Sequence, residues 1–252
     1  MENLDEYLPE SLQGKNVLLT GGTTGIGKAI VQLLAKCGAN VMFFGRHDQE
    51  LQDTLKEVEA LNSASSVYGL TCDVSKKEDI KKIFEEIDDK FEKLDVLINN
   101  AALGYGSIQD GKYDDMEYII STNLTAYLAF AKEAVARMKE NQEGHIINIG
   151  SMSADVREKG SSVYVATKSG VQGFSSALRK EVNEDGIKVT LIEPGAVVTD
   201  MQELEPEEEI NNVEELTMMK PEDIAISVYY CLTLPKRCDV VDLKIRPHLQ
   251  II

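Results

Sequence analysis

A short apolar run that ends in glycines and passes directly into a helical pattern is the feature that most constrains the fold of this chain. Residues 16–20 read Asn-Val-Leu-Leu-Thr, and Gly21 and Gly22 end the run. From Gly25 to about Cys37, apolar side chains recur at the spacing of one helix face. The pattern predicts a strand, a tight glycine turn and a helix.

The same rhythm continues through most of the chain. We expect further strands at about 40–44, 67–72, 95–98, 145–149 and 186–192, and helices at about 49–61, 76–90, 113–139 and from 163 onward. Alternating apolar strands and amphipathic helices are typical of a parallel sheet that is covered on both faces. The expected fold class is therefore α/β, a single doubly wound domain with a parallel sheet of about seven strands.

The glycine turn carries the first sign of chemistry. Thr20-Gly21-Gly22-Thr23-Thr24-Gly25-Ile26-Gly27 lies where the first strand meets the first helix. Glycines let the backbone approach a pyrophosphate closely, and the amides of the helix N-terminus favour its negative charge. The spacing is Gly-x-x-x-Gly-x-Gly and differs from the common dinucleotide fingerprint Gly-x-Gly-x-x-Gly. Taken alone, the turn could also serve only tight packing.

A hydroxyl, a phenol and an ammonium form a second candidate group. The strand at 145–149 ends just before Ser151, while Tyr164 and Lys168 stand four residues apart and share one face of the next helix. Two charges about 4 Å apart interact by roughly 4 kcal/mol at an effective dielectric of about 20, enough to lower a tyrosine pKa from about 10 toward neutrality. Such a phenol can act as a general acid and base. The alternative is an ordinary pair on a helix surface.

Composition excludes several classes of partner. The chain has 26 basic and 43 acidic residues, a net charge of −17, which disfavours nucleic acid and anionic membranes. Four scattered cysteines are typical of reduced thiols, and the histidines show no metal-ligand spacing, so we expect no metal. No stretch approaches the ~18 apolar residues of a membrane span, and the acidic N-terminus has no apolar run. These features predict a cytoplasmic protein.

Taken together, the motifs resemble a known family. They are Thr20-Gly21-x-x-x-Gly25-Ile26-Gly27, Asn99-Asn100-Ala101, Asn123, Ser151, Tyr164-x-x-x-Lys168 and Pro194-Gly195. Their order, and the spacing between Ser151 and Tyr164, resemble the short-chain dehydrogenase/reductase family of the compact single-domain type over about residues 12–248. The resemblance implies one Rossmann-like NAD(P)-binding domain over residues 1–252.

The resemblance also implies roles for four residues at the reacting end. Tyr164 would give a proton to a carbonyl or take one from an alcohol, and Ser151 would hold the substrate oxygen. Lys168 would lower the tyrosine pKa and bind the nicotinamide ribose. Asn123 would anchor a water that links Lys168 to solvent. These are positioning and electrostatic roles, directed at the oxygen on which charge develops.

A larger set of residues would bind the cofactor by the same resemblance. They are Gly21, Thr23, Thr24, Gly25, Ile26, Gly27, Arg46, Asp73, Val74, Asn100, Ala101, Tyr164, Lys168, Pro194, Gly195, Val197 and Thr199. Asp73 would contact the adenine, although it could also be a simple turn former. Asn100 and Ala101 would lie under the adenosine ribose, and the segment from Pro194 to Thr199 would fix the nicotinamide carboxamide.

The end of the second strand indicates which cofactor is used. An acidic residue there would accept hydrogen bonds from the ribose hydroxyls of NAD, whereas an Arg accommodates the 2′-phosphate of NADP. Gly45 and Arg46 stand at this point, so we expect NADP(H) to be preferred over NAD(H). Thr24 is a departure, because many NADP-using relatives carry a second basic residue at that position.

The predicted function is an NADP-dependent oxidoreductase that interconverts a secondary alcohol and a ketone. The alternative is an NADP-binding regulatory or scaffold protein without catalysis, which would not need the set of Asn123, Ser151, Tyr164 and Lys168. The partner is a small-molecule alcohol or ketone, and the resemblance implies a homodimer or homotetramer, packed through the helices at 113–139 and from 163.

Three segments should select the substrate, namely 102–112, 152–162 and 196–220. Residues 200–220 are rich in Glu and are either a solvated surface stretch or a lid over the substrate. Arg157 or Lys159 could anchor a substrate carboxylate, because both stand between Ser151 and Tyr164; the alternative is a surface role for both residues. The C-terminal sequence looks more like members that act on small hydroxy acids or assorted ketones.

Overall fold

The computed structural model describes residues 8–200 and 204–251. Residues 1–7, 201–203 and 252, which belong to the predicted domain and in part to the predicted lid, lie outside these ranges. Seven parallel strands form one sheet in the order β3-β2-β1-β4-β5-β6-β7. They are β1 Asn16–Thr20, β2 Asn40–Gly45, β3 Val67–Thr71, β4 Val96–Asn99, β5 Gly144–Ile149, β6 Ile187–Pro194 and β7 Asp242–Ile245. The predicted fold class is confirmed.

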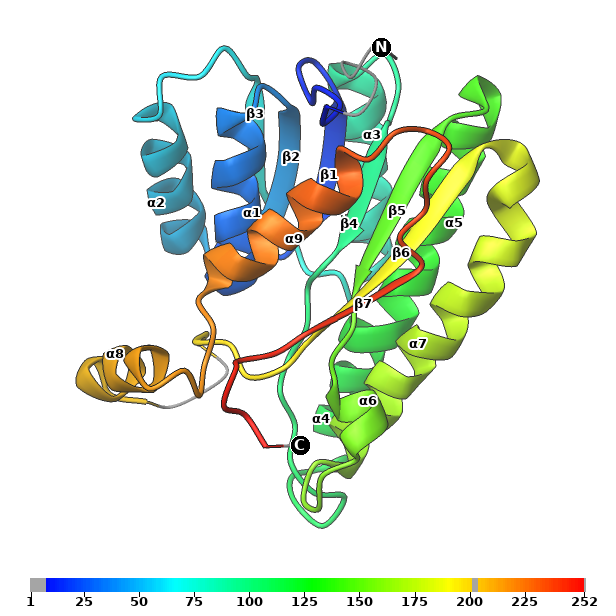
Figure 1. Ribbon diagram of the computed structural model, residues 1–252. Coiled ribbons are helices and arrows are strands. Elements are labelled where there is room, and N and C mark those ends of the chain that lie inside the picture. The colour runs from blue at the N-terminus through cyan, green and yellow to red at the C-terminus, as the bar shows by residue number, and fades with distance from the viewer. Residues whose placement is uncertain (1–7, 201–203, 252) are drawn as a thin grey trace, which may run out of the picture.

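Helices cover both faces of the sheet (Figure 1). The α-helices are α1 Gly25–Lys36, α2 Asp48–Glu59, α3 Lys77–Lys90, α4 Tyr113–Ile120, α5 Ala126–Asn141, α6 Ser153–Val156, α7 Ser162–Val182, α8 Pro206–Glu214 and α9 Pro221–Leu232. Helices α1, α2 and α9 pack on one face, and α3, α5 and α7 on the other. In the described ranges, no helix combines the length and the apolar character that a membrane crossing requires.

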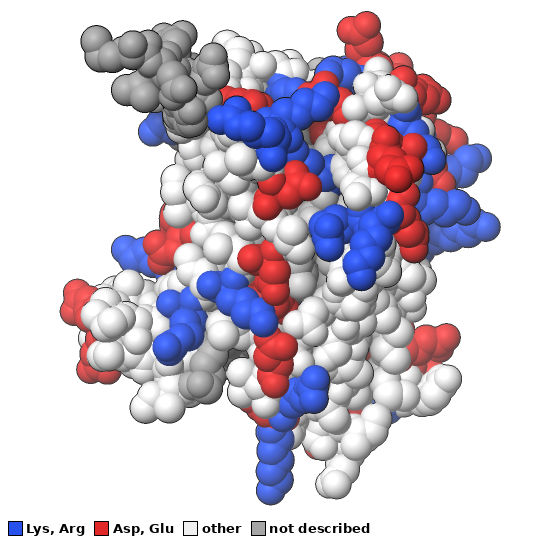
Figure 2. Space-filling view, turned by 45° about the vertical axis from the view of Figure 1, so that its right-hand side comes forward, with Lys and Arg blue, Asp and Glu red and all other residues white. Residues whose placement is uncertain are grey.

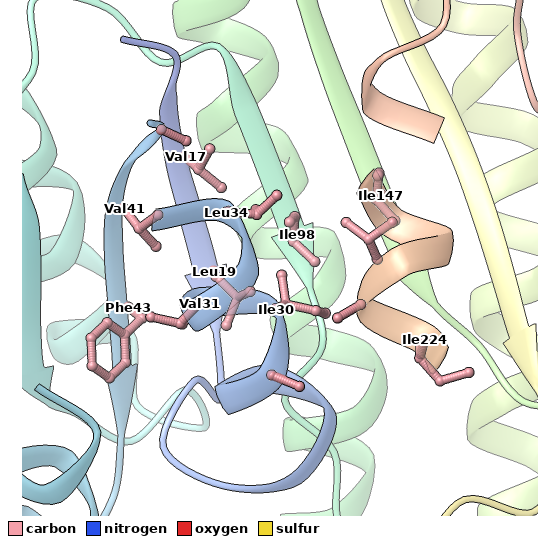
Figure 3. Close-up of a cluster of buried hydrophobic side chains, with 14 of the residues drawn as sticks. Val17, Leu19, Ile30, Val31, Leu34, Val41, Phe43, Ile98, Ile147 and Ile224 are labelled. Atoms are coloured by element: carbon pink, nitrogen blue, oxygen red, sulfur yellow. The ribbon is translucent and has the colours of Figure 1, made fainter. Parts of the chain in front are cut away.

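The core explains why the strands read as continuous apolar runs. On one face, Ile30, Val31 and Leu34 of α1 pack on Val17 and Leu19 of β1, all with 1% or less of their surface exposed (Figure 3). A second cluster fills the other face, between the sheet and α3, α5 and α7. A strand buried on both sides needs apolar residues at successive positions, because neither face meets water. The central strands are therefore held rigidly where they deliver the loops of the site.

The predicted single helix at 113–139 is interrupted. Helix α4 ends at Ile120, a π-helical turn spans Ser121–Thr125, and α5 begins at Ala126. The wider turn places Asn123 in the interior, where its side chain is fully buried. Single π turns inside α-helices are frequent at functional sites, and an apolar period of 3.6 residues does not reveal them.

Candidate functional site

A cleft of about 1160 Å³ lies along the carboxyl ends of the strands. Its walls come from the loops after β1, β2, β3, β4, β5 and β6, and it spans the point between β1 and β4 where the strand order reverses. Ligands of open α/β sheets bind at this position. The predicted residues that line the cleft are Gly21, Thr23, Thr24, Gly25, Ile26, Gly27, Arg46, Val74, Asn100, Ala101, Ser151, Tyr164, Lys168, Pro194, Gly195, Val197 and Thr199. Asp73 and Asn123 do not line it.

The glycine turn has the shape that a phosphate site needs. Gly21 has a positive φ of 68°, and a Cβ atom on Gly27 would lie 1.8 Å from the carbonyl oxygen of Gly21. Thr24, the N-cap residue of α1, makes no capping hydrogen bond with its side chain, and the first turn carries no acidic residue. The amides at the start of α1 thus remain for an anion, and these residues fit the pyrophosphate of a dinucleotide.

Thr20 ties the two central loops together at the bottom of the cleft. Its hydroxyl accepts hydrogen bonds from the amides of Asn100 at 2.8 Å and Ala101 at 2.9 Å. The Asn100 side chain donates in return to the carbonyl oxygens of Thr20 and Gly21 at 3.1 and 2.8 Å. These four bonds fix the loop after β4 against the glycine turn. Asn100 and Ala101 are therefore held firmly against the glycine turn.

Arg46 stands at one end of the cleft and is held by a tyrosine. Its Nη1 donates to the Tyr118 hydroxyl at 3.0 Å, and the Tyr118 hydroxyl donates to Asp73 Oδ2 at 3.2 Å. Burial disfavours the Asp73 carboxylate, but hydrogen bonds from Ser75 and Tyr118 hold its pKa below the ordinary value. In this structure the Asp73 carboxylate accepts hydrogen bonds from Tyr118 and Ser75, and through Tyr118 it helps to position Arg46. Sequence reasoning missed Tyr118, because nothing in the pattern shows that α4 reaches the loops after β2 and β3.

Ser151 and Tyr164 meet at the other end of the cleft. Burial raises the pKa of the Tyr164 phenol, the hydrogen bond with Ser151 lowers it, and the charge of Glu158 raises it further. The net pKa lies above the ordinary value. Removal of the phenol from water outweighs the neighbouring groups in this arrangement, and the lowering of this pKa by Lys168 stays a prediction.

Lys168 lies beneath Tyr164 and is buried, with 1% of its surface exposed. Its ammonium donates to the carbonyl oxygen of Ile149 at 2.9 Å and stands 5.7 Å from the centre of the Tyr164 ring. Burial lowers the pKa of Lys168 to about 7. The Tyr127 hydroxyl donates to the same Ile149 oxygen at 3.2 Å. Lys168 can thus gain or lose a proton near neutral pH, and Tyr127 is a neighbour that sequence reasoning missed.

Asn123 supports a loop of the cleft. Its Oδ1 accepts from the Leu103 amide at 2.8 Å, and its Nδ2 donates to the Leu103 carbonyl oxygen at 2.7 Å. These two bonds use part of the hydrogen-bonding capacity of the side chain, and a water on Asn123 stays a prediction. Thr122, next to it, lines the cleft and has a buried hydroxyl without a hydrogen-bond partner in the described residues.

The substrate end of the cleft differs from the prediction. Neither Arg157 nor Lys159 lines it, whereas Glu158 does. Arg157 caps the end of α6 with a φ of 57°, and its Nε donates to the Ala154 carbonyl oxygen at 3.2 Å. Both side chains are exposed, so the structure favours a surface role for Arg157 and Lys159 over the anchoring of a substrate carboxylate.

A buried acid lies directly behind the reacting end. Glu193, at the end of β6, has no exposed surface, and its Oε2 makes no hydrogen bond in the described residues. Lys244 Nζ lies 3.7 Å from this atom, and Gln172 donates to the other carboxylate oxygen at 3.3 Å. Burial, with the charges of Asp242 and Asp155, raises the pKa of Glu193 to about 7, and Lys244 opposes the change. The described residues contain no group of three or more His, Cys, Asp or Glu that could hold a metal ion.

The strand order, the glycine turn and the cleft at the switch point define a nucleotide-binding α/β protein of the Rossmann type. The family model described as short chain dehydrogenase matches residues 15–210. An uncharacterized oxidoreductase of Staphylococcus aureus (strain MRSA252) is 35% identical over 237 residues, which cover 94% of this chain and 98% of the relative. The chain therefore belongs to the short-chain dehydrogenase/reductase family, as its motifs predict.

Solved structures agree with this assignment. A metagenomic short-chain oxidoreductase in complex with NADP is similar with a TM-score of 0.82 and 26% identity, covering 96% of this chain and 100% of that one. A 3-ketoacyl-(acyl-carrier-protein) reductase from Brucella melitensis, complexed with NADH, has a TM-score of 0.83 and 25% identity over the same shares. This chain is an oxidoreductase of a family that uses nicotinamide cofactors on small-molecule substrates.

Proposed function

We propose that this protein is an NADP-dependent oxidoreductase that interconverts a secondary alcohol and a ketone. The observation that carries the proposal is the hydrogen-bonded pair of Ser151 and Tyr164, with Lys168 buried beneath it, at one end of a cleft that has a phosphate-binding turn. A protein that only bound the cofactor would not need a buried phenol and ammonium at this position. Burial of both groups is costly, which favours a catalytic reason for keeping them.

The residues of the cleft suit a bound dinucleotide. The amides at the start of α1 would hold the pyrophosphate, Asn100 and Ala101 would lie under the adenosine ribose, and Pro194 and Gly195 would flank the nicotinamide. A Cβ atom on Gly195 would lie 2.3 Å from Gln250 Oε1, so the backbone is already closely packed there. When bound, the nicotinamide supplies or accepts the hydride of the reaction.

In the direction of reduction, Ser151 would hold the carbonyl oxygen and Tyr164 would donate a proton to it as the carbonyl carbon gains the hydride. The products are a secondary alcohol and the oxidised cofactor, so the two electrons and the proton are accounted for. Tyr164 then recovers its proton through Lys168, whose pKa of about 7 lets it exchange a proton near neutrality. The raised pKa of Tyr164 keeps the phenol protonated, which suits an acid.

Arg46 supports NADP as the preferred cofactor. It lines the cleft at the end of β2, its guanidinium is exposed, and a tyrosine orients it. Solved relatives carry both NADP and NADH, so the preference is proposed from Arg46 alone. An Arg at this strand end can pair bidentately with the 2′-phosphate that NADP has and NAD lacks.

We also propose that residues 200–220 act as a lid and that the whole chain works as one domain. Helix α8, within this segment, has no buried residue and projects from the body of the molecule (Figure 1). The Leu249 amide donates to the Leu216 carbonyl oxygen at 2.9 Å, so the C-terminal segment holds one end of the lid. Movement of α8 about this fixed end would close the cleft over a substrate.

The proposed oligomer is a homodimer or homotetramer that packs through α5 and α7. Figure 2 shows a broad area with few charged side chains on the side of the molecule that carries α7. Such an area is suited to contact with a second copy, because little charge must be desolvated. Sedimentation velocity of the purified protein would measure the state directly, and a monomer at micromolar concentration would contradict this part of the proposal.

The proposed reaction is tested by mutation of the phenol. A screen of ketones with NADPH oxidation as the readout should find turnover in the wild type, and Tyr164→Phe should lower kcat/KM by about 10²–10⁴-fold. Tyr113→Phe is the matched control, because Tyr113 is 72% exposed on α4 and should leave the rate unchanged. Fluorescence titration should show that Tyr164→Phe still binds NADPH. Persistent turnover in this variant would refute the mechanism.

A further inference from the structure

The charged side chains of the cleft are not evenly distributed. Among the described lining residues, the Lys and Arg side chains are Arg46, at the end of β2, and Lys168, buried below the reacting group. Glu158 lines the substrate end, and Asp200 lines the cleft at the start of the segment that holds the proposed lid. A substrate at the reacting end would therefore face carboxylates without a free cation beside them.

Glu158 is coupled to the reacting residues. The Ser153 hydroxyl donates to Glu158 Oε1 at 3.3 Å, and the Ser153 amide donates to the Ser151 hydroxyl oxygen at 3.1 Å. The charge of Glu158 reaches Tyr164, because it raises the pKa of that phenol. Within the described residues, Glu158 has no ion-pair partner. Its negative charge therefore acts on the end of the cleft that contains Ser151 and Tyr164.

Apolar side chains form much of this end of the cleft, beside small and polar residues such as Thr122 and Ser161. Leu103 and Tyr105 come from the loop after β4, and Met152 and Val156 from the segment around α6. The Tyr105 hydroxyl donates to the Asp110 carbonyl oxygen at 2.9 Å, so its polar end is occupied within its own loop. An apolar wall with one acidic group suits a ligand that is partly apolar and carries a hydrogen-bond donor or a positive charge.

We propose that the substrate is a carbonyl compound, or the corresponding alcohol, without an anionic group, whose donor or cationic end faces Glu158. This inference rests on the proposed function and adds the substrate class. A carboxylate or phosphate on the substrate would be repelled by Glu158 and would meet no unburied cation among the described lining residues at this end of the cleft. Of the two substrate classes that the C-terminal sequence predicts, small hydroxy acids are then poor substrates and neutral ketones are favoured.

Three ketones of nearly equal size test the proposal. Hydroxyacetone is neutral, aminoacetone is cationic and pyruvate is anionic, and all three present a methyl ketone. NADPH oxidation is the readout. We expect kcat/KM for pyruvate to be at least about fivefold to tenfold lower than kcat/KM for hydroxyacetone, which is the size of the repulsion between two like charges that solvent partly screens. Aminoacetone should equal or exceed hydroxyacetone. Ethyl acetoacetate serves as a larger neutral substrate.

The variant Glu158→Gln removes the charge and keeps the shape of the side chain. The rate with pyruvate, divided by the rate with hydroxyacetone in the same variant, should rise toward one, and the preference for aminoacetone should disappear. Glu181→Gln is the matched control, because it removes the same charge from an exposed position on α7 and should leave all ratios unchanged.

The outcomes separate this inference from the proposed reaction. If neutral ketones are reduced in a Tyr164-dependent manner but pyruvate is reduced equally well, only the substrate class is overturned. The same holds if the ratios in Glu158→Gln match those of the wild type. If NADPH binds but no carbonyl compound is reduced, the proposed function fails and the substrate class fails with it.

Discussion

The ammonium of Lys168 lies 2.9 Å from the carbonyl oxygen of Ile149, and this hydrogen bond ties α7 to the last residue of β5. Because Ser151 follows two residues later in the chain, the bond fixes the distance between the strand that carries the hydroxyl and the helix that carries the phenol. Tyr127 donates to the same oxygen from α5. The reacting groups are thus held by elements on rigid core layers, as accurate positioning requires.

The buried ammonium of Lys168 should cost the protein stability. Because burial lowers its pKa from 10.5 to about 7, the contribution of Lys168 to stability is most favourable above pH 10.5 and falls as the pH decreases toward 7. Lys168→Met should therefore raise the unfolding free energy at pH 7 by about 1–2 kcal/mol, while it abolishes turnover. Thermal denaturation at pH 7 and pH 10 measures this, and the gain in Tm should be smaller at pH 10. A less stable Lys168→Met protein at pH 7 would contradict the expectation.

Tyr118 should matter for cofactor choice although it reaches the cofactor only through Arg46. Tyr118→Phe keeps the ring 5.9 Å from the Arg46 guanidinium carbon but removes the hydroxyl that accepts its hydrogen bond. We expect the Kd for NADPH to rise about two- to tenfold, as for one lost hydrogen bond, with little change for NADH. Arg46→Ala should show the same selectivity with a larger loss.

The control for Tyr118→Phe is Tyr113→Phe, on the same helix but exposed to solvent. Fluorescence titrations of NADPH and NADH with all three variants give the comparison. Equal weakening of both cofactors in Arg46→Ala would show that Arg46 does not select the 2′-phosphate. A normal Kd for NADPH in Tyr118→Phe, with weak binding in Arg46→Ala, would limit the selection to Arg46 itself.

The fold and most of the site could be predicted because their signals are local in sequence. The glycine turn, the apolar strands and the pair of Tyr164 and Lys168 each depend on residues within one or two turns of each other. The π-helical turn at Ser121–Thr125 could not be predicted, because one extra residue in a long helix hardly changes its apolar pattern.

The contacts that the sequence did not reveal are between distant segments. Tyr118 meets Arg46 across 72 positions of the chain, and Glu193 meets Lys244 only because β6 and β7 pair in parallel. Arg157 is the reverse case, a residue that is close to the reacting residues in sequence but makes its contact elsewhere. It stands between the two reacting residues in sequence, but the left-handed cap of α6 turns its side chain to the Ala154 carbonyl oxygen. The position of a residue along the chain does not determine the direction in which its side chain points from a loop.

His145, near the start of β5, should make the protein sensitive to acid. It is buried, and its Nε2 lies 2.8 Å from the Thr190 hydroxyl, which itself donates to the Val240 carbonyl oxygen. Burial, aided by the Lys188 charge, lowers the pKa of His145 to about 3. The neutral ring therefore contributes stability that is complete above pH 6.5 and is lost as the pH falls toward 3, at about 1.4 kcal/mol per pH unit.

The variant His145→Gln tests this, because it keeps a polar side chain that does not titrate. Its unfolding free energy in urea should be lower than that of the wild type at pH 7, and the difference should shrink between pH 6.5 and pH 4. His47→Gln is the control, since His47 is exposed beside α2. Parallel curves for the wild type and His145→Gln would rule out a buried neutral histidine.

Glu193 should have the opposite pH dependence. Its pKa is raised by burial and by neighbouring acids to about 7, so the folded protein holds a proton that the unfolded chain releases near pH 4.5. The contribution of Glu193 to stability is therefore complete below pH 4.5 and is lost as the pH rises through 7. Glu193→Gln cannot ionise and should be more stable than the wild type at pH 8 by roughly 1–3 kcal/mol, with a smaller gain at pH 5. The alternative is that Glu193 stays ionised and forms an ion pair with Lys244. In that case Glu193→Gln would be less stable than the wild type at pH 8, because Lys244 would lose its buried partner. Urea unfolding at both pH values distinguishes the two cases.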